Sequence, residues 1–498
     1  MHSKRKGNRI SINSRNFRKY QTHPSDGFFE VLNMENWLKM ASEAVPDKIA
    51  VKFNSEMITY GALHEEALLL AGKIKAMGQH RVGVFIYNSL DSLKLIHAMM
   101  QAQVEMVFIN TRLTHHEITA QLHDVGVTTI IATKPLDIRG FKVIDFGDLN
   151  ELEPVELEGR PVHGDDVLSI MFTSGTTGRA KAVKQTYLNH YASAKGCEKR
   201  FGYSGDSVWM QINPIFHISG LSIVLRCVIA QCTNVLVERF EEGKILNLLK
   251  EEKVTHTSLV PVMLQRLLKS GNDFGPHLQG ILLGGAGVTK KVLKEALDGD
   301  LPVYNSFGMT ETCSQIVSIP HTDPNILNGT VGKALENVEL KVDGAGELLV
   351  KGENVSPGYL NAEMERADGY FKTGDLARID EAGYLYILDR RKDLIISGGE
   401  NIYPKEIEDR VLEVSGVESC VVVKVQDAQW GEAPVLLVQG DEDIKEDILK
   451  HLTETLARYK MPRDIHFVDE VIMTSTGKVS RRKNYEQYMK NHQSGAPD

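Results

Sequence analysis

Helical and strand-like patterns alternate along the first part of this 498-residue chain, and this alternation restricts its fold more than any other feature. Apolar residues recur at helical spacing over 63–77 and 93–102 and after Thr114, while short apolar runs at 82–87 and 106–110 indicate strands. A further helix is expected over 185–195. Strands that alternate with helices build layered domains with largely parallel sheets. The pattern therefore predicts the α/β fold class.

A hydroxyl- and glycine-rich loop follows the strand-like run 170–172. Small residues let backbone amides approach an anion, and the hydroxyls and a lysine add donors and charge, so the loop is suited to a polyphosphate. It is not a Walker A motif, because Ala180 rather than glycine precedes the lysine. An ordinary Ser/Thr-rich surface turn is the alternative. The candidate phosphate-binding residues are Thr173, Ser174, Gly175, Thr176, Thr177, Gly178 and Lys181.

Two later strand ends carry small residues and one aromatic, which can enclose a flat ring such as adenine. Glu311 follows the second strand and can hold a divalent metal ion on the phosphates. Asp375 follows a tight turn, as a carboxylate that binds a ribose diol requires. The candidate nucleotide-binding residues of the two strand ends are Gly285, Ala286, Asn305, Phe307, Gly308 and Thr310.

An apolar helical segment contains one cation, Arg226, and begins just after His217. A single buried histidine is usually a satisfied core residue. A buried arginine costs several kcal/mol unless an anion pairs with it. That anion is either a carboxylate of the protein or one of a ligand, and the residues alone leave both open.

The pattern changes twice toward the C-terminus. Alternating residues at 338–342 and 346–350 indicate a hairpin of a small β-rich subdomain. After about residue 391, a glycine turn, short strands and a helix at 442–459 indicate a separate α+β domain. We therefore expect a large domain over 34–391 and a small domain over 392–498. Near its end, Lys478 follows a glycine, which by itself is ordinary for a surface residue.

The composition is that of a globular protein, with 42% hydrophobic and 25% charged residues. The formal net charge of -9 argues against nucleic-acid binding. Five scattered cysteines without a CxxC pair favour a reducing, cytoplasmic location without structural zinc. No apolar run approaches the roughly 18 to 20 residues of a membrane span, so we expect no membrane partner. A homo-oligomer remains open.

Residues 1–33 carry seven basic residues before the first acidic one, Asp26, which resembles a transit peptide. The pattern of a folded domain begins at Met34, and the codons of Glu30 and Val31 fit a ribosome-binding sequence upstream of it. We expect Met34 to be the true start and 1–33 to be a mis-called extension or a disordered tail. The intact mass of the native protein tests this.

Five motifs, in this order, resemble the adenylate-forming acyl-CoA synthetase superfamily over essentially the whole chain from Met34. They are TSGTTGRAK, FGMTE, YFKTGDLARID, DRRKDLIISGGENIYPKEIE and STGKVSRR. Jointly they are very specific, whereas each alone is weak. The resemblance implies a large N-terminal domain with layered sheets and a mobile C-terminal lid. It also implies ATP and Mg²⁺ as cofactors and CoA as co-substrate.

The superfamily pattern assigns roles to matching positions. It implies phosphate binding by Thr173 to Lys181, a Mg²⁺ ligand at Glu311, an adenine slot at Gly285, Ala286 and Phe307 with Asn305 at its edge, and ribose contacts at Asp375 and Arg390. Lys392 matches the pivot between the domains, Lys478 the lysine of the adenylation step, and Gly398 and Gly399 the lining of a CoA tunnel. The small domain is expected to rotate between adenylation and thioester formation.

Some positions depart from the superfamily pattern. Ala180 and Ala182 replace a proline and a glycine, Phe307 replaces a tyrosine, and Ile472 replaces a proline before the lysine. Phe307 keeps the ring face for stacking. We expect these changes to loosen loops and affect rates more than activity itself.

Within the superfamily, PIFHISGLSIVLR, MLQRLL, FGMTETCSQIV and LARYKMP resemble the o-succinylbenzoate–CoA ligases of menaquinone biosynthesis. This resemblance implies an acid with two carboxylates, one adenylated and one anchored. Arg226 would pair with the aromatic carboxylate, and His217 would line the acyl site near the reacting group with a catalytic role. An aryl- or fatty-acyl-CoA ligase acting on a monocarboxylic acid is the first alternative. A carrier-loading adenylation domain, a luciferase-like oxygenase and a nucleotide sensor with a decayed site are the others.

Overall fold

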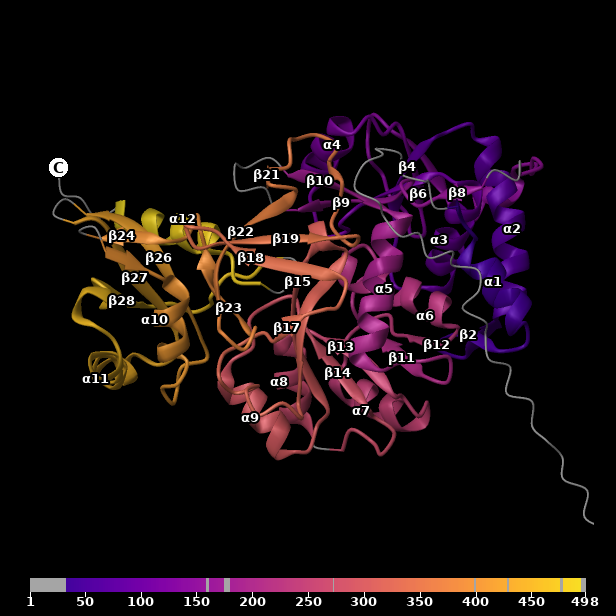
Figure 1. Cartoon of the computed structure of the whole chain (residues 1–498). Helices are drawn as coiled ribbons and strands as arrows, with labels where there is room; N and C mark the ends of the chain where they lie inside the picture. Colours follow the sequence, from indigo (N-terminus) through magenta and orange to yellow (C-terminus); the bar gives the residue numbers. More distant parts are fainter. Residues whose placement is uncertain are drawn as a thin grey trace, which may run out of the picture.

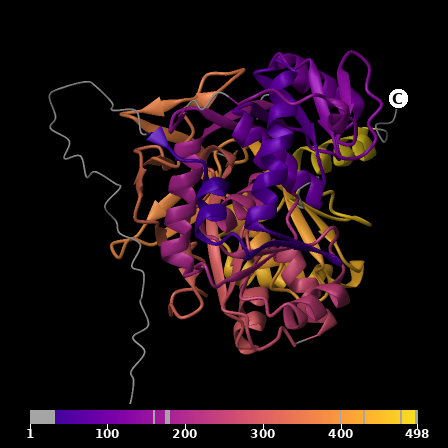
Figure 2. The same ribbon diagram turned by 90° about the vertical axis from the view of Figure 1, so that its right-hand side faces the viewer.

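The computed structural model describes residues 33–157, 161–173, 180–271, 273–397, 400–427, 430–474 and 478–493. Figure 1 shows a large body formed by the N-terminal and middle parts of the chain and a smaller body, orange to yellow, formed by the C-terminal part. In the side view the helices of the N-terminal part, in indigo, face the viewer and the yellow body lies behind (Figure 2). The predicted α/β fold class with a small C-terminal domain is confirmed.

Two mixed sheets form the frame of the large body. Among the described residues the first has seven strands, in the order β20 (Gly358–Tyr359), β10 (Lys181–Thr186), β9 (Val167–Thr173), β5 (Glu105–Phe108), β4 (Arg81–Phe85), β6 (Thr129–Ala132) and β7 (Lys142–Asp145). Strands β9, β5, β4, β6 and β7 are parallel, as the alternation of helices and strands predicts. A two-stranded sheet of β1 (Asn33–Met34) and β8 (Val162–His163) lies apart from it.

The second sheet has nine described strands and carries the later motifs. Their order is β17 (Lys333–Ala334), β16 (Ser314–Pro320), β15 (Val303–Met309), β14 (Gly280–Leu283), β13 (His256–Leu259), β11 (Val208–Gln211), β12 (Thr233–Leu236), β2 (Ile49–Phe53) and β3 (Glu56–Thr59). The strands from β15 to β2 are parallel, and β16, β17 and β3 are added by antiparallel pairing.

Helices fill the space between the sheets and cover their outer faces. One apolar core joins both sheets to the inner helices, which are α1 (Trp37–Ala44), α2 (Tyr60–Ala76), α3 (Leu90–Ala102), α5 (Tyr187–Phe201) and α6 (Ile218–Ala230). On β5, Met106 and Phe108 face this core while Val107 faces a second core with α4 (His115–Asp124). A third core joins the nine-stranded sheet to α7 (Glu242–Glu251), α8 (Pro261–Ser270) and α9 (Lys290–Asp298). The large body therefore has five layers.

A β-rich subdomain follows, as predicted. Its strands are β18 (Val338–Val342), β19 (Glu347–Gly352), β21 (Arg366–Ala367), β22 (Tyr370–Ile379) and β23 (Leu385–Arg390). The small domain has a separate sheet of β24 (Ile395–Ser397), β25 (Glu400–Ile402), β26 (Ser419–Asp427), β27 (Gly431–Gln439) and β28 (Asp464–Phe467), packed with α10 (Pro404–Val411), α11 (Lys445–Thr455) and α12 (Arg481–Gln493). The predicted domain limits at 33/34 and 391/392 stay predictions.

Local sequence explains where several elements begin, and it corrects two expectations. Thr114 caps α4 in a capping box with Glu117, so this helix starts where predicted. A helix expected from Gln185 begins only at Tyr187, because 181–186 form the antiparallel strand β10 and Thr186 caps the helix. The helix expected over 442–459 is shorter, since α11 ends at Thr455. In both places the helical pattern of the sequence continues past the end of the actual helix, so the predicted helix was too long.

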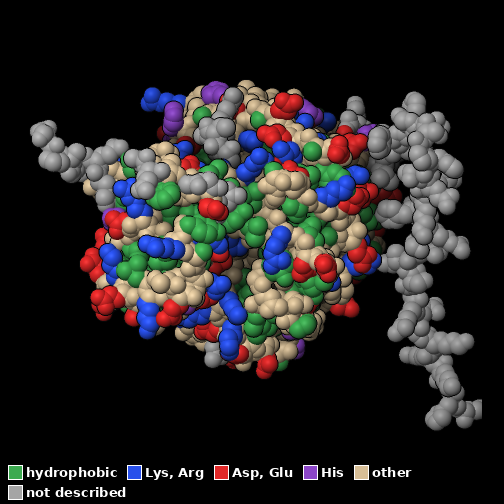
Figure 3. All heavy atoms as spheres, turned by 60° about the vertical axis from the view of Figure 1, so that its left-hand side comes forward, with side chains coloured by type: hydrophobic (Ala, Val, Ile, Leu, Met, Phe, Trp, Pro, Cys, Tyr) green, Lys and Arg blue, Asp and Glu red, His purple; other side chains and the backbone are tan. Residues whose placement is uncertain are grey.

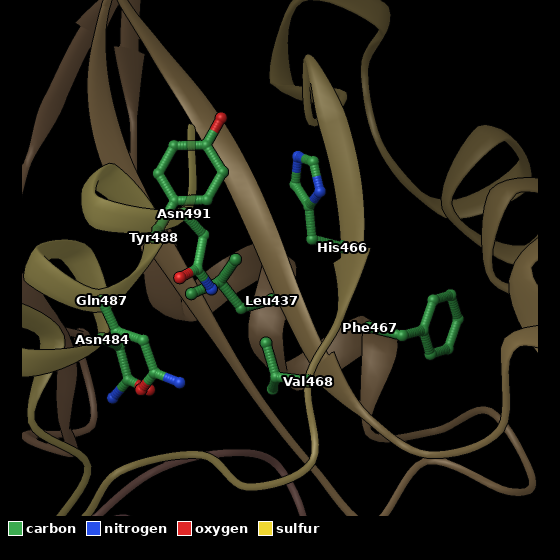
Figure 4. A pocket seen from close by; sticks show the side chains of 8 residues that line it. All are labelled: Leu437, His466, Phe467, Val468, Asn484, Gln487, Tyr488 and Asn491. Carbon is green, nitrogen blue, oxygen red and sulfur yellow. The ribbon is translucent and has the colours of Figure 1, made fainter. Parts of the chain in front are cut away.

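The surface shown in Figure 3 mixes acidic, basic and apolar side chains over both bodies. In the part of the chain that the structure describes, no helix combines the length and apolarity needed to cross a bilayer. All five cysteines are buried and free. A small pocket lies between β27, β28 and α12 of the small domain (Figure 4), and it contains none of the predicted site residues. It is lined by Leu437, His466, Phe467, Val468, Asn484, Gln487, Tyr488 and Asn491.

Candidate active site

The residues that follow the predicted phosphate loop are held by Asn361, which lies just after strand β20. Residues 174–179, and with them most of the loop's predicted ligands, lie outside the described residues. Beyond them, the backbone N–H of Ala182 donates to Asn361 Oδ1 at 2.8 Å, and Asn361 Nδ2 donates to the Ala180 carbonyl at 2.9 Å. Lys181 stands between the two alanines with its Nζ 4.9 Å from the ring centroid of Tyr359. One amide side chain thus braces the backbone on both sides of the predicted phosphate lysine.

Glu311, the predicted metal ligand, is fixed through its side chain and its backbone. Tyr359 Oη donates to Glu311 Oε1 at 3.0 Å, and the N–H of Ser356 donates to the Glu311 carbonyl at 2.8 Å. The turn is also held one residue earlier, because Gln185 Nε2 donates to the Thr310 carbonyl at 2.7 Å. Glu311 and Lys181 therefore both contact Tyr359.

The predicted adenine slot lies at the ends of β14 and β15. Gly285 has φ +83°, a backbone conformation that favours glycine. Gly308 lies opposite Gln315 at an irregularity of the ladder, where a Cβ atom would lie only 2.0 Å from the Ser314 carbonyl oxygen. Phe307 is half-buried beside Gly308, and Asn305 donates to the Thr330 carbonyl at 3.3 Å. The structure places Asn305, Phe307 and Gly308 on one strand, β15.

Asp375 is the most strongly perturbed carboxylate of the site. It is 2% exposed, its Oδ1 pairs with Arg390 Nε at 2.7 Å, and its Oδ2 has no hydrogen-bond partner among the described residues. Burial raises the pKa of Asp375 to about 6, although Arg390 and Lys478 act in the opposite direction. A buried carboxylate oxygen without a partner is a candidate for a ligand hydroxyl.

Lys478 of the small domain lies in the same electrostatic environment as these residues. Its side chain remains exposed to solvent, yet the surrounding protein and Arg390 lower its pKa, while Asp375 and Glu311 act to raise it. Lys478 thus lies near these charged groups while solvent still reaches it. The predicted lysine of adenylation and the predicted ribose and metal carboxylates, which are far apart in sequence, are brought together.

His217 is placed near the same lysine and is neutral at ordinary pH. Burial, together with the positive charges of Arg112 and Lys478, lowers its pKa to about 4. Its Nε2 is buried without a hydrogen-bond partner among the described residues. A neutral imidazole with a free nitrogen can accept or donate a hydrogen bond to a ligand but carries no charge to pair with one.

Arg226 is buried, and no described carboxylate lies within ion-pair distance of it. Its side chain is 1% exposed, and its Nε and Nη2 have no hydrogen-bond partner among the described residues. The guanidinium carbon lies 5.8 Å from the ring centroid of Trp209. The Arg226 charge, added to burial, lowers the pKa of His190 to about 3. The internal ion pair that the sequence left open is therefore absent from the described residues.

The sheet face next to Arg226 carries other polar groups without partners. Register places Trp209 of β11, Ser258 of β13 and Ser318 of β16 on one face of the nine-stranded sheet, with Gln315 beside Gly308 on the same face. This face packs on α5 and α6. The buried polar atoms of these four side chains have no hydrogen-bond partner in the described part of the chain. Because native interiors leave few such groups, this face is a candidate acyl site.

The small domain is joined to the large one by hydrogen bonds beside the predicted pivot. Lys392 is exposed between β23 and β24. Asp389 accepts from the N–H of Lys405 at 2.9 Å, and its Oδ1 lies 3.9 Å from Arg481 Nη2. The predicted CoA-tunnel residues Gly398 and Gly399 lie outside the described residues.

Sequence reasoning missed Tyr359, Asn361, Asp389 and Arg481. The first two lie in a short turn whose residues carry no nucleotide motif, so only the folded arrangement places them at the site. Asp389 and Arg481 lie inside the quoted motifs DRRKDLIISGGENIYPKEIE and STGKVSRR. A buried aspartate next to a proposed pivot was a usable signal for them.

Comparison with known proteins agrees with this geometry. Residues 38–360 match the AMP-binding enzyme family, and residues 406–478 match the AMP-binding enzyme C-terminal domain. A 2-succinylbenzoate–CoA ligase of Staphylococcus epidermidis is 44% identical over 463 residues, which cover 90% of this chain and 97% of the relative.

Solved structures of o-succinylbenzoate CoA synthetase from Bacillus subtilis are similar over nearly the whole fold. The complex with the acyl-adenylate intermediate OSB-AMP has a TM-score of 0.87 and 32% sequence identity and covers 91% of this chain and 98% of its own. The complex with ATP and magnesium ion has a TM-score of 0.85 at the same identity, covering 91% and 99%.

Proposed function

The chain belongs to the AMP-binding enzyme family, and from this premise we propose that it joins 2-succinylbenzoate (o-succinylbenzoate) to CoA at the expense of ATP, as an acid–thiol ligase of menaquinone biosynthesis. ATP, Mg²⁺ and CoA are its co-reactants. Its relatives carry this activity in their names, and a relative of the same fold binds the acyl-adenylate. The resemblance of the sequence to the adenylate-forming superfamily and to its o-succinylbenzoate–CoA ligases is confirmed.

The first half-reaction forms the acyl-adenylate. A carboxylate oxygen of the acid attacks the α-phosphorus of ATP, and the bond to the β-phosphate oxygen breaks, so pyrophosphate leaves. In this chain Lys478 stabilises the negative charge that develops on the α-phosphate, and His217 orients the attacking carboxylate through a hydrogen bond. Asp375 holds the ribose through its unpartnered Oδ2.

Glu311 suits Mg²⁺ because hard carboxylate and phosphate oxygens are its preferred ligands. In the described part of the chain Tyr359 donates to Oε1 of the carboxylate, and Oε2 is left for the ion. Bound there, the ion would neutralise phosphate charge. No group of three His, Cys, Asp or Glu side chains suited to a metal occurs in the described ranges, which fits an ion held by one carboxylate and the phosphates.

The second half-reaction transfers the acyl group to CoA. The CoA thiolate attacks the acyl carbonyl, AMP leaves, and the thiol proton passes to solvent. We propose that the small domain rotates about Lys392 between the two steps, withdrawing Lys478 and bringing the segment with Gly398 and Gly399 to the carbonyl.

One observation carries the choice of acid, namely the buried guanidinium of Arg226 without an anion. Leaving this charge unpaired costs several kcal/mol, and a ligand carboxylate removes that cost. An acid with one carboxylate, which is consumed by adenylation, cannot do so. The unpaired polar groups of Trp209, Ser258, Gln315 and Ser318 nearby favour an acid that is polar along its length. A dicarboxylate of the succinylbenzoate type meets both conditions.

Thioester formation with a panel of acids tests this function. The enzyme is given ATP, Mg²⁺, CoA and either o-succinylbenzoate, benzoate or a medium-chain fatty acid, and the acyl-CoA product is identified by mass. We expect o-succinylbenzoyl-CoA, AMP and pyrophosphate in equal amounts. Preference for a monoacid would keep the ligase chemistry but overturn the proposed substrate.

We expect a cytoplasmic location, and co-fractionation with soluble protein checks it.

A further inference from the structure

A short segment contacts both Lys181 and Glu311, the two charged residues predicted to bind the ATP phosphates and their metal ion. Residues 356–361, here called the brace, connect the β-rich subdomain to the seven-stranded sheet through β20. Strand β20 pairs antiparallel with β10, so Tyr359 lies opposite Val183, two residues after Lys181. On its other side the brace meets the turn that carries Glu311. No motif of the sequence analysis includes it.

Four hydrogen bonds fix the brace to residues 180–184, which follow the phosphate loop. Asn361 contacts the backbone of Ala180 and of Ala182, and the N–H of Leu360 donates to the Ala182 carbonyl at 2.8 Å. Ser356 Oγ donates to the Lys184 carbonyl at 2.6 Å. The two alanines that were expected to loosen the loop are thus held by a side chain and a backbone group from outside it.

Tyr359 touches both charged groups with different parts of its side chain. Its hydroxyl donates to Glu311 Oε1 at 3.0 Å, while Lys181 Nζ lies 4.9 Å from the ring centroid. The tyrosine is 9% exposed, so the protein around it holds its side chain in this position. A hydrogen bond to one oxygen fixes the carboxylate plane and directs the other oxygen elsewhere.

We propose that Tyr359 is a positioning residue that orients Glu311 toward the metal ion on the ATP phosphates, and that the brace sets the distance between this carboxylate and Lys181. The proposal rests on Glu311 being the metal ligand of the proposed function. Side chains that orient a metal ligand commonly raise metal affinity roughly ten- to hundredfold, because they hold the ligand in place before the ion binds.

Two substitutions at one position separate the two contacts. Tyr359→Phe removes the hydroxyl and keeps the ring under Lys181, whereas Tyr359→Leu removes both. Tyr370→Phe is the matched control, because the Tyr370 hydroxyl also donates to a carboxylate, Glu339 Oε2 at 2.6 Å, and is buried to a similar degree. Glu311→Gln reports whether the carboxylate binds the ion at all.

The primary measurement is the dissociation constant of Mn²⁺ in complexes with α,β-methylene ATP, read by electron paramagnetic resonance without turnover. We expect Tyr359→Phe to raise this constant by about tenfold or more, with Tyr370→Phe within about twofold of the wild type. Nucleotide affinity without metal should be unchanged in Tyr359→Phe and weaker in Tyr359→Leu. Turnover of Tyr359→Phe should recover at high Mg²⁺, since the ligand is misplaced rather than lost.

The outcomes distinguish the proposal from its premise. If Glu311→Gln weakens Mn²⁺ binding and Tyr359→Phe does not, the positioning role is wrong and the metal site stands. If Glu311→Gln leaves Mn²⁺ binding unchanged, the metal ligand itself is wrongly assigned. If Tyr359→Phe fails to fold, Asn361→Ala tests the brace, and unchanged nucleotide affinity in that variant would overturn its role at the loop.

Discussion

The carboxylate of Asp389, on the last strand of the β-rich subdomain, accepts the backbone N–H of Lys405 at 2.9 Å at the start of α10. The same carboxylate lies 3.9 Å from Arg481, on the helix that follows Lys478. Two elements of the small domain are thereby attached to one residue of the large body. This attachment belongs to the arrangement in which Lys478 lies near Asp375 and Glu311.

Replacing Asp389 should therefore slow adenylation more than thioester formation. Asp389→Ala removes the acceptor for Lys405, which weakens the adenylating arrangement by about one charged hydrogen bond and lowers acid-dependent ATP–pyrophosphate exchange about tenfold. Conversion of synthetic acyl-adenylate and CoA to the thioester should change far less. The control is Glu413→Ala, which removes surface contacts with Arg410 and His451 that lie entirely within the small domain. Equal losses in both half-reactions would contradict this assignment.

Asp375 should make the free enzyme less stable at neutral pH. Folding raises its pKa from 3.8 to about 6, so the folded protein binds this proton more tightly than the unfolded chain. Stability therefore falls as the pH rises from about 4 to about 6, and the penalty is complete above that range. We expect Asp375→Asn to be more stable than the wild type at pH 7.5 by about 1 to 3 kcal/mol, with the difference shrinking toward pH 4.

Chemical denaturation at the two pH values measures that difference, and ATP titration of the same protein measures the functional loss. The variant should bind ATP more weakly, because an amide is a poorer partner than a carboxylate for a ribose diol. A variant that is less stable than the wild type at pH 7.5 would show that the Arg390 pair outweighs the cost of burial.

We expect Arg481 to stabilise the fold of the small domain. Its guanidinium pairs with both oxygens of Glu408 and donates to the Val422 carbonyl at 2.8 Å, which joins α12 to α10 and β26. Removing one member of a partly buried pair leaves the other charge without a partner. Arg481→Met should therefore lower the free energy of local unfolding of the small domain by about 3 kcal/mol. Hydrogen exchange of α10 and β26 peptides reads this directly.

The neighbouring arginine is a suitable control for that experiment. Arg482 forms only an exposed pair with Glu486 one turn away, at 3.1 Å, so Arg482→Met should cost about 0.5 kcal/mol or less. Similar exchange rates in the two variants would argue that the buried network around Arg481 contributes little.

Sequence reasoning found the fold class and the chemical groups, because these depend on local pattern. Alternating apolar runs fixed the order of strands and helices, and residues such as Glu311, Asp375 and Lys478 stand in motifs that chemistry makes recognisable. Strand β10 was missed because the charged and polar residues within 181–186 obscure its two-residue period. Its pairing with β9, across the phosphate loop, identifies it as a strand.

Contacts between distant segments were beyond the reach of local pattern. The hydroxyl of Tyr359 meets Glu311 across 48 residues, and nothing in the sequence around Tyr359 specifies a carboxylate partner. Likewise the sequence left two partners open for Arg226, and only the packing of α5, α6 and the nine-stranded sheet shows no carboxylate among the described residues close enough to pair with it.

The most direct test of the central claim compares o-succinylbenzoate with benzoate in the wild type and in Arg226→Met, which replaces the cation by an apolar side chain of similar length. We predict that the wild type prefers the diacid by orders of magnitude in kcat/KM, and that the substitution lowers kcat/KM for the diacid by about a hundredfold while changing that for benzoate by less than about threefold. Should the variant not fold, the wild-type ratio alone decides. A wild type that converts both acids equally, or a folded variant that loses both activities to the same degree, would contradict the role given to Arg226.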